Sequence, residues 1–398
     1  MRFKTIRDFD LNNKRVLLRA DLNVPAQNGK VTDATRIDRL KPTIDALCKS
    51  GAKILVLSHF GRPEGERNPQ MSLAFLTSAL QKSWGVDVKF SQDCIGEAAE
   101  NAAASLKAGE ILLLENLRFH KGEEENDQKF AKELAKLGDI YVNDAFSAAH
   151  RAHASTEGLA HLLPAAAGML MEEELKALDA ALGNPKKPVA AVTGGSKIST
   201  KLSILNNLVE RVDYLILGGA MATTFVYAQG GEIGNSMCEK NMKDEALRIM
   251  AHAKKNNCEI ILPIDVVSVT EIKENAISKI VPADQVPEGR MAIDAGPESL
   301  ALITEKIKSC KTVVWNGPLG VFEIKPFDQG TNQLARLVAE LTQKGLMTSI
   351  AGGGDTVAAL ENAGAANKFT YISTAGGAFL EWLEGKTLPG VAALMAKK

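Results

Sequence analysis

Short apolar runs alternate with helical patterns along the whole chain. The runs are rich in Val, Ile and Leu, which is typical of parallel strands covered by helices on both faces. Because strands and helices alternate, we expect the α/β class, with two Rossmann-like domains that each hold a helix-covered parallel sheet. The predicted strands are 15–20, 53–58, 86–90, 111–115 and 139–143 in the first half, and 188–193, 214–217, 259–264, 312–315, 347–351 and 369–373 in the second.

A helical pattern separates the two halves. Apolar residues recur at helical spacing from Met171 to Leu182, and Gly183-Asn184-Pro185 ends the pattern. We interpret 171–187 as a connecting helix and hinge between an N-terminal domain, 1–170, and a C-terminal domain, 188–379. The alternative is a surface helix inside one large domain. A chain of 398 residues is long for a single domain, so its length favours two domains.

Composition narrows the class of protein. The chain is 45% hydrophobic and 24% charged, and its net charge of −1 offers no general basic field for nucleic acid. The five cysteines are scattered without a CxxC pair, as in proteins with reduced thiols. Charges at Arg2, Lys4 and Arg7 disfavour a signal peptide, and the uncharged stretch 214–231 is broken by glycines. We therefore expect a cytoplasmic protein that binds neither nucleic acid nor a membrane.

Charged and amide residues follow the predicted strands of the first half. Ligands of open α/β sheets bind beyond the carboxyl ends of the strands, so these residues are candidates for one site. One arginine alone could be a solvated surface charge, but several at equivalent strand ends predict a small, multiply anionic ligand. His150 and His153 could suggest a metal pair, although no further ligand pattern supports one. The runs are Arg19-Ala20-Asp21-Leu22-Asn23, Thr35-Arg36-Ile37, Ser58-His59-Phe60-Gly61-Arg62, Glu115-Asn116-Leu117-Arg118, and Asn143 to Ser147 followed by His150-Arg151-Ala152-His153.

Glycines follow the predicted strands of the second half instead. They occur at Gly194-Gly195, Gly218-Gly219, Gly317, Gly352-Gly353-Gly354 and Gly376-Gly377. Glycine allows the backbone to approach a ligand closely, and a helix N-terminus beyond it favours phosphate. The sequence therefore predicts a nucleotide site in this half.

Three charged residues near these glycines suit a nucleotide. Lys197 and Lys201 could reach its phosphates, and Asp355 could hold Mg²⁺, which takes one or two carboxylates together with phosphate oxygens. The alternative is that Asp355 or Thr356 only caps a helix. The chain contains neither G-x-x-x-x-G-K-[ST] nor G-x-G-x-x-G, which argues against a P-loop ATPase and a nicotinamide dehydrogenase.

A polyanion site and a nucleotide site together predict phosphoryl transfer, which needs positioning and charge stabilisation rather than covalent chemistry by the protein. The sequence resembles the phosphoglycerate kinase family over nearly its whole length. The matching stretches are RADLNVP (19–25), SHFGRP (58–63), LLLENLRF (112–119), DAFSAAHRAHAS (144–155), GGSKISTK (194–201), WNGPLGVFE (315–323) and GGGDT (352–356).

The resemblance implies reversible phosphoryl transfer between MgATP and the carboxylate of 3-phosphoglycerate, a glycolytic step that yields ADP and 1,3-bisphosphoglycerate. It further implies a monomer and a C-terminal tail, 380–398, that returns to the N-terminal domain. The substrate-binding residues that it implies are Asp21, Asn23, Arg36, His59, Arg62, Arg118 and Arg151. The nucleotide-binding residues are Lys197 and Lys201 on the phosphates, Gly218 and Gly219 beside adenine, Glu323 on the ribose, and Asn316, Gly352, Gly353, Gly354, Asp355 and Thr356, with Asp355 also on magnesium.

Four residues are expected to act on the transferring group: Arg36, Lys201, Gly376 and Gly377. The nucleophile would be the carboxylate of the substrate, so no general base is needed. The family usually has three glycines where this chain has Ala375-Gly376-Gly377. Ligands on separate domains must be brought together, so we expect hinge closure. The alternative function is a non-catalytic, two-lobed protein that binds phosphate or other anions.

Overall fold

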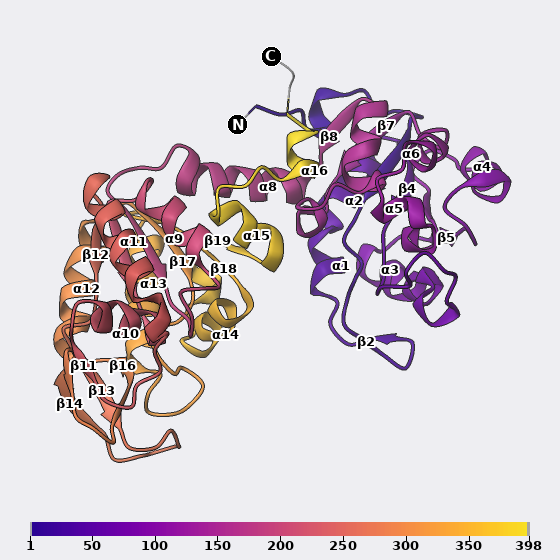
Figure 1. Ribbon diagram of the computed structural model, residues 1–398. Coiled ribbons are helices and arrows are strands. Elements are labelled where there is room, and N and C mark those ends of the chain that lie inside the picture. Colours follow the sequence, from indigo (N-terminus) through magenta and orange to yellow (C-terminus); the bar gives the residue numbers. More distant parts are fainter. Residues whose placement is uncertain (1, 396–398) are drawn as a thin grey trace. The chain divides into compact units, whose positions relative to one another are not determined.

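The computed structural model describes residues 2–395 and divides into two compact units (Figure 1). The first unit runs to Lys176 and includes the chain from Thr387 onward, and the second is Ala177–Lys386. Helix α8 (Met169–Leu178) contains the first division point, and a single π-helical turn, Asp179–Gly183, follows it.

The first unit is built on a six-stranded sheet in which every pairing is parallel. Its spatial order is β5 (Val88–Phe90), β6 (Ile111–Leu113), β4 (Lys53–Leu57), β1 (Arg15–Arg19), β7 (Ile140–Asn143) and β8 (Ala165–Ala167). The remaining elements are the hairpin β2 (Ala26–Gln27) and β3 (Lys30–Val31), and the helices α1 (Thr35–Arg39), α2 (Lys41–Lys49), α3 (Thr77–Trp84), α4 (Gly96–Ala104), α5 (Lys121–Glu124), α6 (Gln128–Ala135), α7 (Leu159–Leu162) and α16 (Pro389–Ala392).

Both faces of this sheet are buried. Along β1, Val16 and Leu18 pack with Ile44 and Leu47 of α2, while Leu17 on the opposite face is equally inaccessible. This burial explains why the strands are continuous apolar runs without polar alternation.

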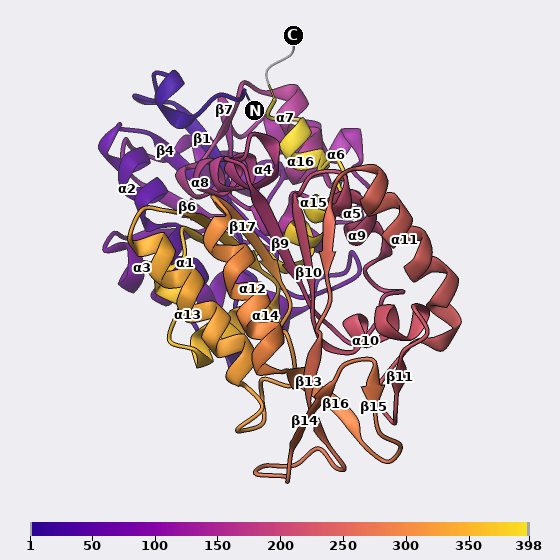
Figure 2. The ribbon, with the colours of Figure 1, turned by 90° about the vertical axis from the view of Figure 1, so that its left-hand side faces the viewer.

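The second unit has its own six-stranded parallel sheet. Its order is β12 (Glu259–Ile261), β10 (Tyr214–Leu217), β9 (Val189–Thr193), β17 (Thr312–Asn316), β18 (Thr348–Gly352) and β19 (Tyr371–Ser373). Two groups of helices flank the strands in Figure 2: α12 (Pro297–Ser309), α13 (Gln329–Gln343) and α14 (Gly354–Asn362) in one, and α9 (Leu202–Val209), α10 (Gly219–Ala228) and α11 (Lys243–Lys255) in the other. Helix α15 (Gly376–Leu383) packs on α9.

All eleven predicted strands have a counterpart in the two sheets, and the predicted α/β class with helix-covered parallel sheets is confirmed. The prediction missed β8, whose three alanines are poor strand formers. It also missed a small antiparallel sheet of β13 (Asp265–Val269), β14 (Lys279–Pro282) and β16 (Met291–Ala295), and the short parallel pair β11 (Glu232–Ile233) and β15 (Gln285–Val286).

The C-terminal segment belongs to the first unit from Thr387 onward, whereas we expected the tail to begin at 380. Residues up to Leu383 continue α15, where the Asn207 side chain donates to the Leu383 carbonyl at 2.7 Å. Beyond it, Gly390 N–H donates to the Ala149 carbonyl at 2.9 Å, and Met395 forms an antiparallel bridge with Phe3. The later start therefore reflects the packing of α15 on α9.

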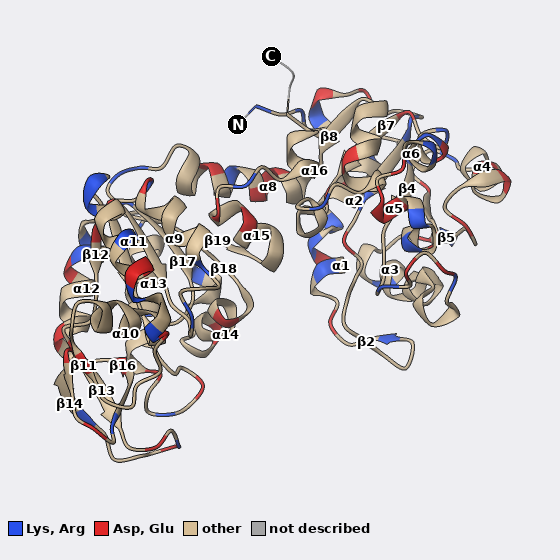
Figure 3. Cartoon of the chain, in the orientation of Figure 1, with Lys and Arg blue, Asp and Glu red and all other residues tan. Residues whose placement is uncertain are grey.

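Lys and Arg positions are interspersed with Asp and Glu positions along the chain of each unit (Figure 3), and the net charge is −1. Within residues 2–395, no helix combines the length and the apolar composition that crossing a membrane requires.

Candidate functional site

In the first unit, the charged residues predicted from the sequence follow neighbouring strands. Strands β6, β4, β1 and β7 are adjacent and parallel, so their carboxyl ends share one edge of the sheet. Asp21 and Asn23 come after β1, and His59 and Arg62 come after β4. Arg118 follows β6, Arg151 follows β7, and Arg36 is in the last turn of α1.

Three of these residues contact one another directly. The Arg36 guanidinium lies 3.0 Å from a carboxylate oxygen of Asp21 and donates to the Asn23 carbonyl at 2.8 Å. The Asn23 side-chain oxygen accepts from Gly61 N–H at 3.1 Å, and the Ser147 hydroxyl donates to Asp21. The ends of β1, β4 and β7 are therefore joined through these groups.

Asn116 positions Arg118. Its side-chain oxygen accepts from the N–H groups of Arg118 and Phe60, and its amide donates to the Phe60 and Met71 carbonyls. The Arg118 guanidinium donates to the Gly61 carbonyl at 2.8 Å and lies 3.2 Å from Glu124. Burial lowers the pKa of Arg118, and Glu124 opposes that shift. Arg118 is thus a buried cation beyond the end of β6, and its backbone is held by the Asn116 side chain, whose oxygen and amide both have hydrogen-bond partners.

Imidazoles and guanidiniums are close together at this edge. Burial and then the charges of Arg19 and Arg118 hold the pKa of His59 well below its usual value. Burial, followed by the charges of Arg118 and Arg19, lowers the pKa of His153 to about 4. The histidines are therefore neutral at physiological pH, and the positive charge resides on the guanidiniums, which suits a polyanion. Arg151 lies 3.3 Å from His150, and Arg62 is exposed.

In the second unit, one cavity of about 800 Å³ gathers most of the predicted nucleotide-binding residues. All of them line it except Gly218 and Gly352, where a side chain would collide with Leu319 and Phe379 respectively. A further part of the wall is apolar and contains Met237, Ile272, Met291, Ile293, Val321 and Phe322. A slot of this kind suits the flat face of a base.

Lys201 is the most strongly held polar group of this cavity. Its ammonium donates to the Gly194 carbonyl at 2.6 Å and to the carbonyl and side-chain oxygens of Asn316 at 3.1 and 2.7 Å. Burial lowers the pKa of Lys201 to about 8, and Asp355 opposes the shift. Burying a cation is costly unless it is paired, so an anionic ligand here would stabilise the charged form.

The glycine run at the end of β18 forms the start of α14. Gly353 has φ +98°, which a residue with a side chain rarely adopts, and it is the N-cap of the helix. No side chain caps α14, and Asp355 is exposed in its first turn. The Thr356 hydroxyl instead accepts from Gly317 N–H at 2.8 Å. The alternative that Asp355 or Thr356 caps this helix is therefore wrong.

Two loops that carry site residues approach each other too closely for side chains. A Cβ at Gly194 would lie 1.6 Å from the Pro318 carbonyl oxygen, and one at Gly317 would lie 2.3 Å from that of Gly194. Gly194 N–H also donates to the Asn316 carbonyl at 3.2 Å. The glycines after β9 and β17 thus bring Asn316 to Lys201.

Gly376 and Gly377 begin α15, and neither lines the cavity. Ala375, which stands where the resemblance leads us to expect glycine, is the N-cap of that helix with φ −93°. This φ is negative, so Ala375 does not occupy the left-handed region that favours glycine.

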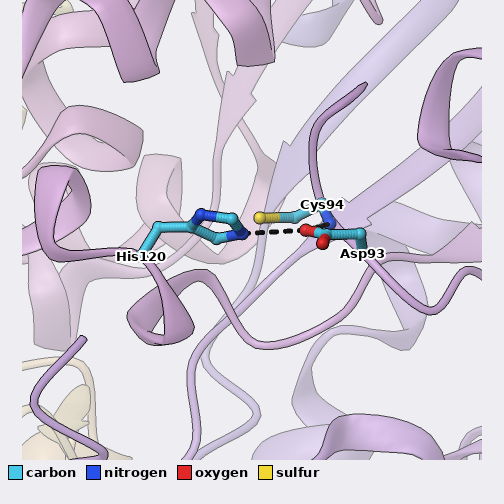
Figure 4. A group of neighbouring side chains, drawn as sticks. All are labelled: Asp93, Cys94 and His120. Atoms are coloured by element: carbon cyan, nitrogen blue, oxygen red, sulfur yellow. Dashed lines mark hydrogen bonds and ion pairs between the residues drawn. The ribbon is translucent and has the colours of Figure 1, made fainter. Parts of the chain in front are cut away.

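Asp93, Cys94 and His120 bring three metal-ligating groups within 4.8 Å of one another in the first unit (Figure 4). This group could not be predicted from the sequence, because the three residues show no metal-ligand spacing. His120 and Asp93 already pair at 2.8 Å, and the second carboxylate oxygen of Asp93 lies 3.0 Å from Arg67. Burial holds the pKa of the Cys94 thiol well above its usual value. A cation would compete with Arg67 and require an unfavourable thiolate, so we interpret the group as structural.

Comparison with known proteins decides the family. The model of the phosphoglycerate kinase family matches residues 6–386. A phosphoglycerate kinase of Rhodospirillum centenum is 57% identical over 396 residues, which is 100% of both chains. The chain belongs to the phosphoglycerate kinase family. Another phosphoglycerate kinase, from Ruegeria sp., is 59% identical over 99% of this chain and 100% of its own. The solved structure of phosphoglycerate kinase from Coxiella burnetii matches with a TM-score of 0.93 and 44% identity, covering 98% of each chain.

Family membership makes the chain an enzyme, a glycolytic kinase whose reaction is a reversible phosphoryl transfer. The predicted family and class of reaction are confirmed.

Sequence reasoning overlooked two features of these sites. Arg19 was seen at the end of a strand but was not assigned a role, because nothing in the sequence tells that its guanidinium is buried. The apolar wall of the cavity comes from segments such as 291–293 and 235–237, which carry no recognisable motif.

Proposed function

We propose that the enzyme transfers the γ-phosphoryl group of MgATP reversibly to the carboxylate of 3-phosphoglycerate, and that each unit binds one substrate. The observation that supports this division most directly is the cavity of the second unit, where all the predicted nucleotide-binding residues except Gly218 and Gly352 surround one space. The acceptor is the carboxylate of the substrate, which is ionised at neutral pH, so the protein needs no general base.

On the first unit, guanidiniums bind the phosphate and carboxylate of 3-phosphoglycerate. Arg36, Arg62, Arg118 and Arg151 supply the charge, because their planar forks pair with both anionic groups. Asp21 and Asn23 bind the hydroxyl group and orient Arg36, with which they are already in contact. His59 is neutral and donates a hydrogen bond to the ligand.

On the second unit, Lys197 and Lys201 bind the nucleotide phosphates, and Glu323 binds the ribose. The base lies on the apolar wall, with Gly218 and Gly219 nearby, and Asn316 holds Lys201 in place. The N–H groups of Gly353 to Thr356 at the start of α14 face the nucleotide phosphates. Those of Gly376 and Gly377 at the start of α15 lie outside the lining of this cavity and face the transferring phosphoryl group.

Asp355 fits the magnesium that accompanies the nucleotide. It is exposed, caps no helix and lines the same cavity as Lys201. One carboxylate with phosphate oxygens and water is the donor set that Mg²⁺ prefers. The ion would neutralise charge on the phosphate oxygens.

Transfer requires the acceptor carboxylate to reach the γ-phosphorus, so the ternary complex must bring the two units together by hinge closure. The hinge includes residues 171–187. The enzyme acts as a monomer in the cytoplasm, as its resemblance to the family implies.

Replacing Asp355 with asparagine should separate metal binding from folding. We expect Asp355→Asn to weaken MgADP binding at least tenfold while lowering the free energy of unfolding by no more than about 1 kcal/mol, since the carboxylate makes no cap and only its charge in the first turn of α14 is lost. Calorimetric titration of MgADP and of 3-phosphoglycerate measures both affinities, and the latter should not change. A loss of stability with unchanged MgADP affinity would contradict the metal role, and an equal loss of both affinities would contradict the division of ligands between the units.

The pKa of Lys201 predicts proton uptake on nucleotide binding. Near pH 8 about half of the ligand-free molecules lack this proton, and phosphate charge favours the protonated amine. MgADP affinity should therefore fall as the pH rises through 8, and binding at pH 8 should take up a fraction of a proton that vanishes at pH 6.5. Calorimetry in buffers of different ionisation enthalpy measures this uptake. Undiminished uptake in Lys201→Met would show that another group is responsible.

A further inference from the structure

The Arg19 guanidinium is buried behind the substrate edge of the first unit. It is at the end of β1 and only 1% exposed. It donates through Nη2 to Nδ1 of His59 at 2.9 Å, through Nε to the Ser155 hydroxyl at 2.8 Å, and through Nη1 to the Ala20 carbonyl. Because a guanidinium can only donate, Nδ1 of His59 must accept.

This contact determines the chemical form of His59. With Nδ1 as an acceptor, the ring is neutral and carries its proton on Nε2. The cationic ring and the Nδ1–H tautomer would both place a hydrogen against a positive donor. His59 can therefore donate its Nε2–H to a ligand. In this neutral form, the ring donates a hydrogen bond to an anion without carrying a positive charge.

The charge that balances Arg19 is on Glu123 in α5. Its side chain is fully buried, and both of its carboxylate oxygens accept from Ser155: one from the hydroxyl at 2.5 Å and the other from the N–H at 2.9 Å. Burial raises the pKa of Glu123, and Arg19 and the two Ser155 bonds oppose that shift. With both oxygens accepting, the carboxylate is the form that the geometry satisfies.

Ser155 links the Glu123 carboxylate to the Arg19 guanidinium and fixes the direction of the hydrogen bonds between them. Its hydroxyl has one hydrogen, which goes to Glu123, so the oxygen is left to accept from Arg19 Nε. Its backbone is fixed as well, since Tyr141 donates to the Ser155 carbonyl at 2.7 Å. The direction of every hydrogen bond from Glu123 to His59 is thus determined: Ser155 donates to Glu123, Arg19 donates to Ser155, and Arg19 donates to His59.

We propose that Glu123 is a positioning residue for the acceptor substrate: acting through Ser155 and Arg19, it fixes His59 as the Nε2–H tautomer that donates to 3-phosphoglycerate. The contribution to substrate binding rests on the proposed function, but the tautomer does not. Without the carboxylate, the Ser155 hydroxyl is free to rotate, and the buried Arg19 loses its counter-charge and part of its restraint.

The variants Glu123→Gln and Ser155→Ala test this proposal. The first removes the charge and keeps the size, and the second removes only the hydroxyl. In each, we expect the KM for 3-phosphoglycerate to rise about tenfold, comparable to the loss of one charge-assisted hydrogen bond. The KM for MgATP should stay within twofold of its original value. The ¹⁵N spectrum of His59 should change from one tautomer to a mixture in both variants.

Glu115→Gln is the matched control. Glu115 is also a buried glutamate of the first unit, and it accepts from Ser72, Leu73 and Asn116, without a hydrogen bond to Arg19 or His59. We expect it to lower stability but to leave the His59 spectrum unchanged. A single, unaltered tautomer in Glu123→Gln and Ser155→Ala, or an equal change in the control, would overturn the proposal.

The same measurements distinguish a failure of the proposed function. Should the tautomer change while the KM for 3-phosphoglycerate does not, His59→Ala, which removes the ring and supplies no other donor, decides between two explanations. An unchanged KM in His59→Ala would show that His59 does not bind the substrate, which contradicts the proposed function. A raised KM there would show that the tautomer is irrelevant to binding, which contradicts the positioning role.

Discussion

Replacing Lys201 with methionine is expected to lower kcat by about 10²–10³-fold, by analogy with the loss of one oxyanion donor or of an arginine finger. Methionine keeps the length and much of the volume of the side chain but removes the charge. The ammonium is held by three oxygens at 2.6 to 3.1 Å inside the proposed nucleotide cavity, so it is already in place to meet the phosphates of a nucleotide. Preorganised charge of this kind stabilises the transition state without reorganisation during the reaction.

Single-turnover measurements with saturating MgATP and 3-phosphoglycerate separate chemistry from binding. Lys306→Met is the control, because Lys306 is in the same unit and pairs with Glu259 at 2.7 Å outside the cavity. It should leave kcat within twofold of the original value. Near-normal turnover in Lys201→Met would exclude a role of this ammonium in the transition state.

The second large effect is expected at Arg36. We predict that Arg36→Ala lowers kcat by about 10²–10³-fold and also raises the KM for 3-phosphoglycerate. Two causes combine here. The substitution removes a cation from the transferring group, and it leaves the Asp21 carboxylate with only the Ser147 hydroxyl as a side-chain partner, which adds negative charge where a polyanion must bind.

Arg67→Ala provides a closely matched control. Arg67 belongs to the same unit, and its guanidinium lies 3.0 Å from Asp93, the same separation as that between Arg36 and Asp21. It lies outside the proposed substrate-binding set, so kcat and KM should be nearly unchanged. Similar losses in the two variants would mean that general charge, rather than the position of Arg36, governs turnover.

The parallel sheets could be predicted because their strands are buried on both faces. Each strand is then a continuous apolar run, as in Val16–Leu18. The end of the run marks the end of the strand, so the residues that follow it can be identified in the sequence. The antiparallel sheet of β13, β14 and β16 gave no comparable signal. Lys279 and Ile280 of β14 are both exposed, so no burial pattern distinguishes the two faces of that strand.

The candidate site also contains residues that could be predicted from the sequence and residues that could not. Groups that we propose to face the ligand, such as Arg118 and Lys201, follow strand ends and can be predicted from that position. Groups that act from behind, such as Glu123 and Ser155, depend on which side chains fold against Arg19. Sequence spacing carries no information on that contact. The proposed role of Asp355 also depends on the structure, since only the backbone shows that Gly353 is the N-cap of α14.

The central claim is that binding of the two ligands ends in phosphoryl transfer. A coupled assay for ADP formation, with MgATP and 3-phosphoglycerate supplied together and separately, tests it most directly. The account predicts rapid ADP formation that requires both substrates. In Arg36→Ala and Lys201→Met, only a small fraction of this rate should remain. Binding of both ligands without ADP formation would contradict the account and would favour a non-catalytic anion-binding protein.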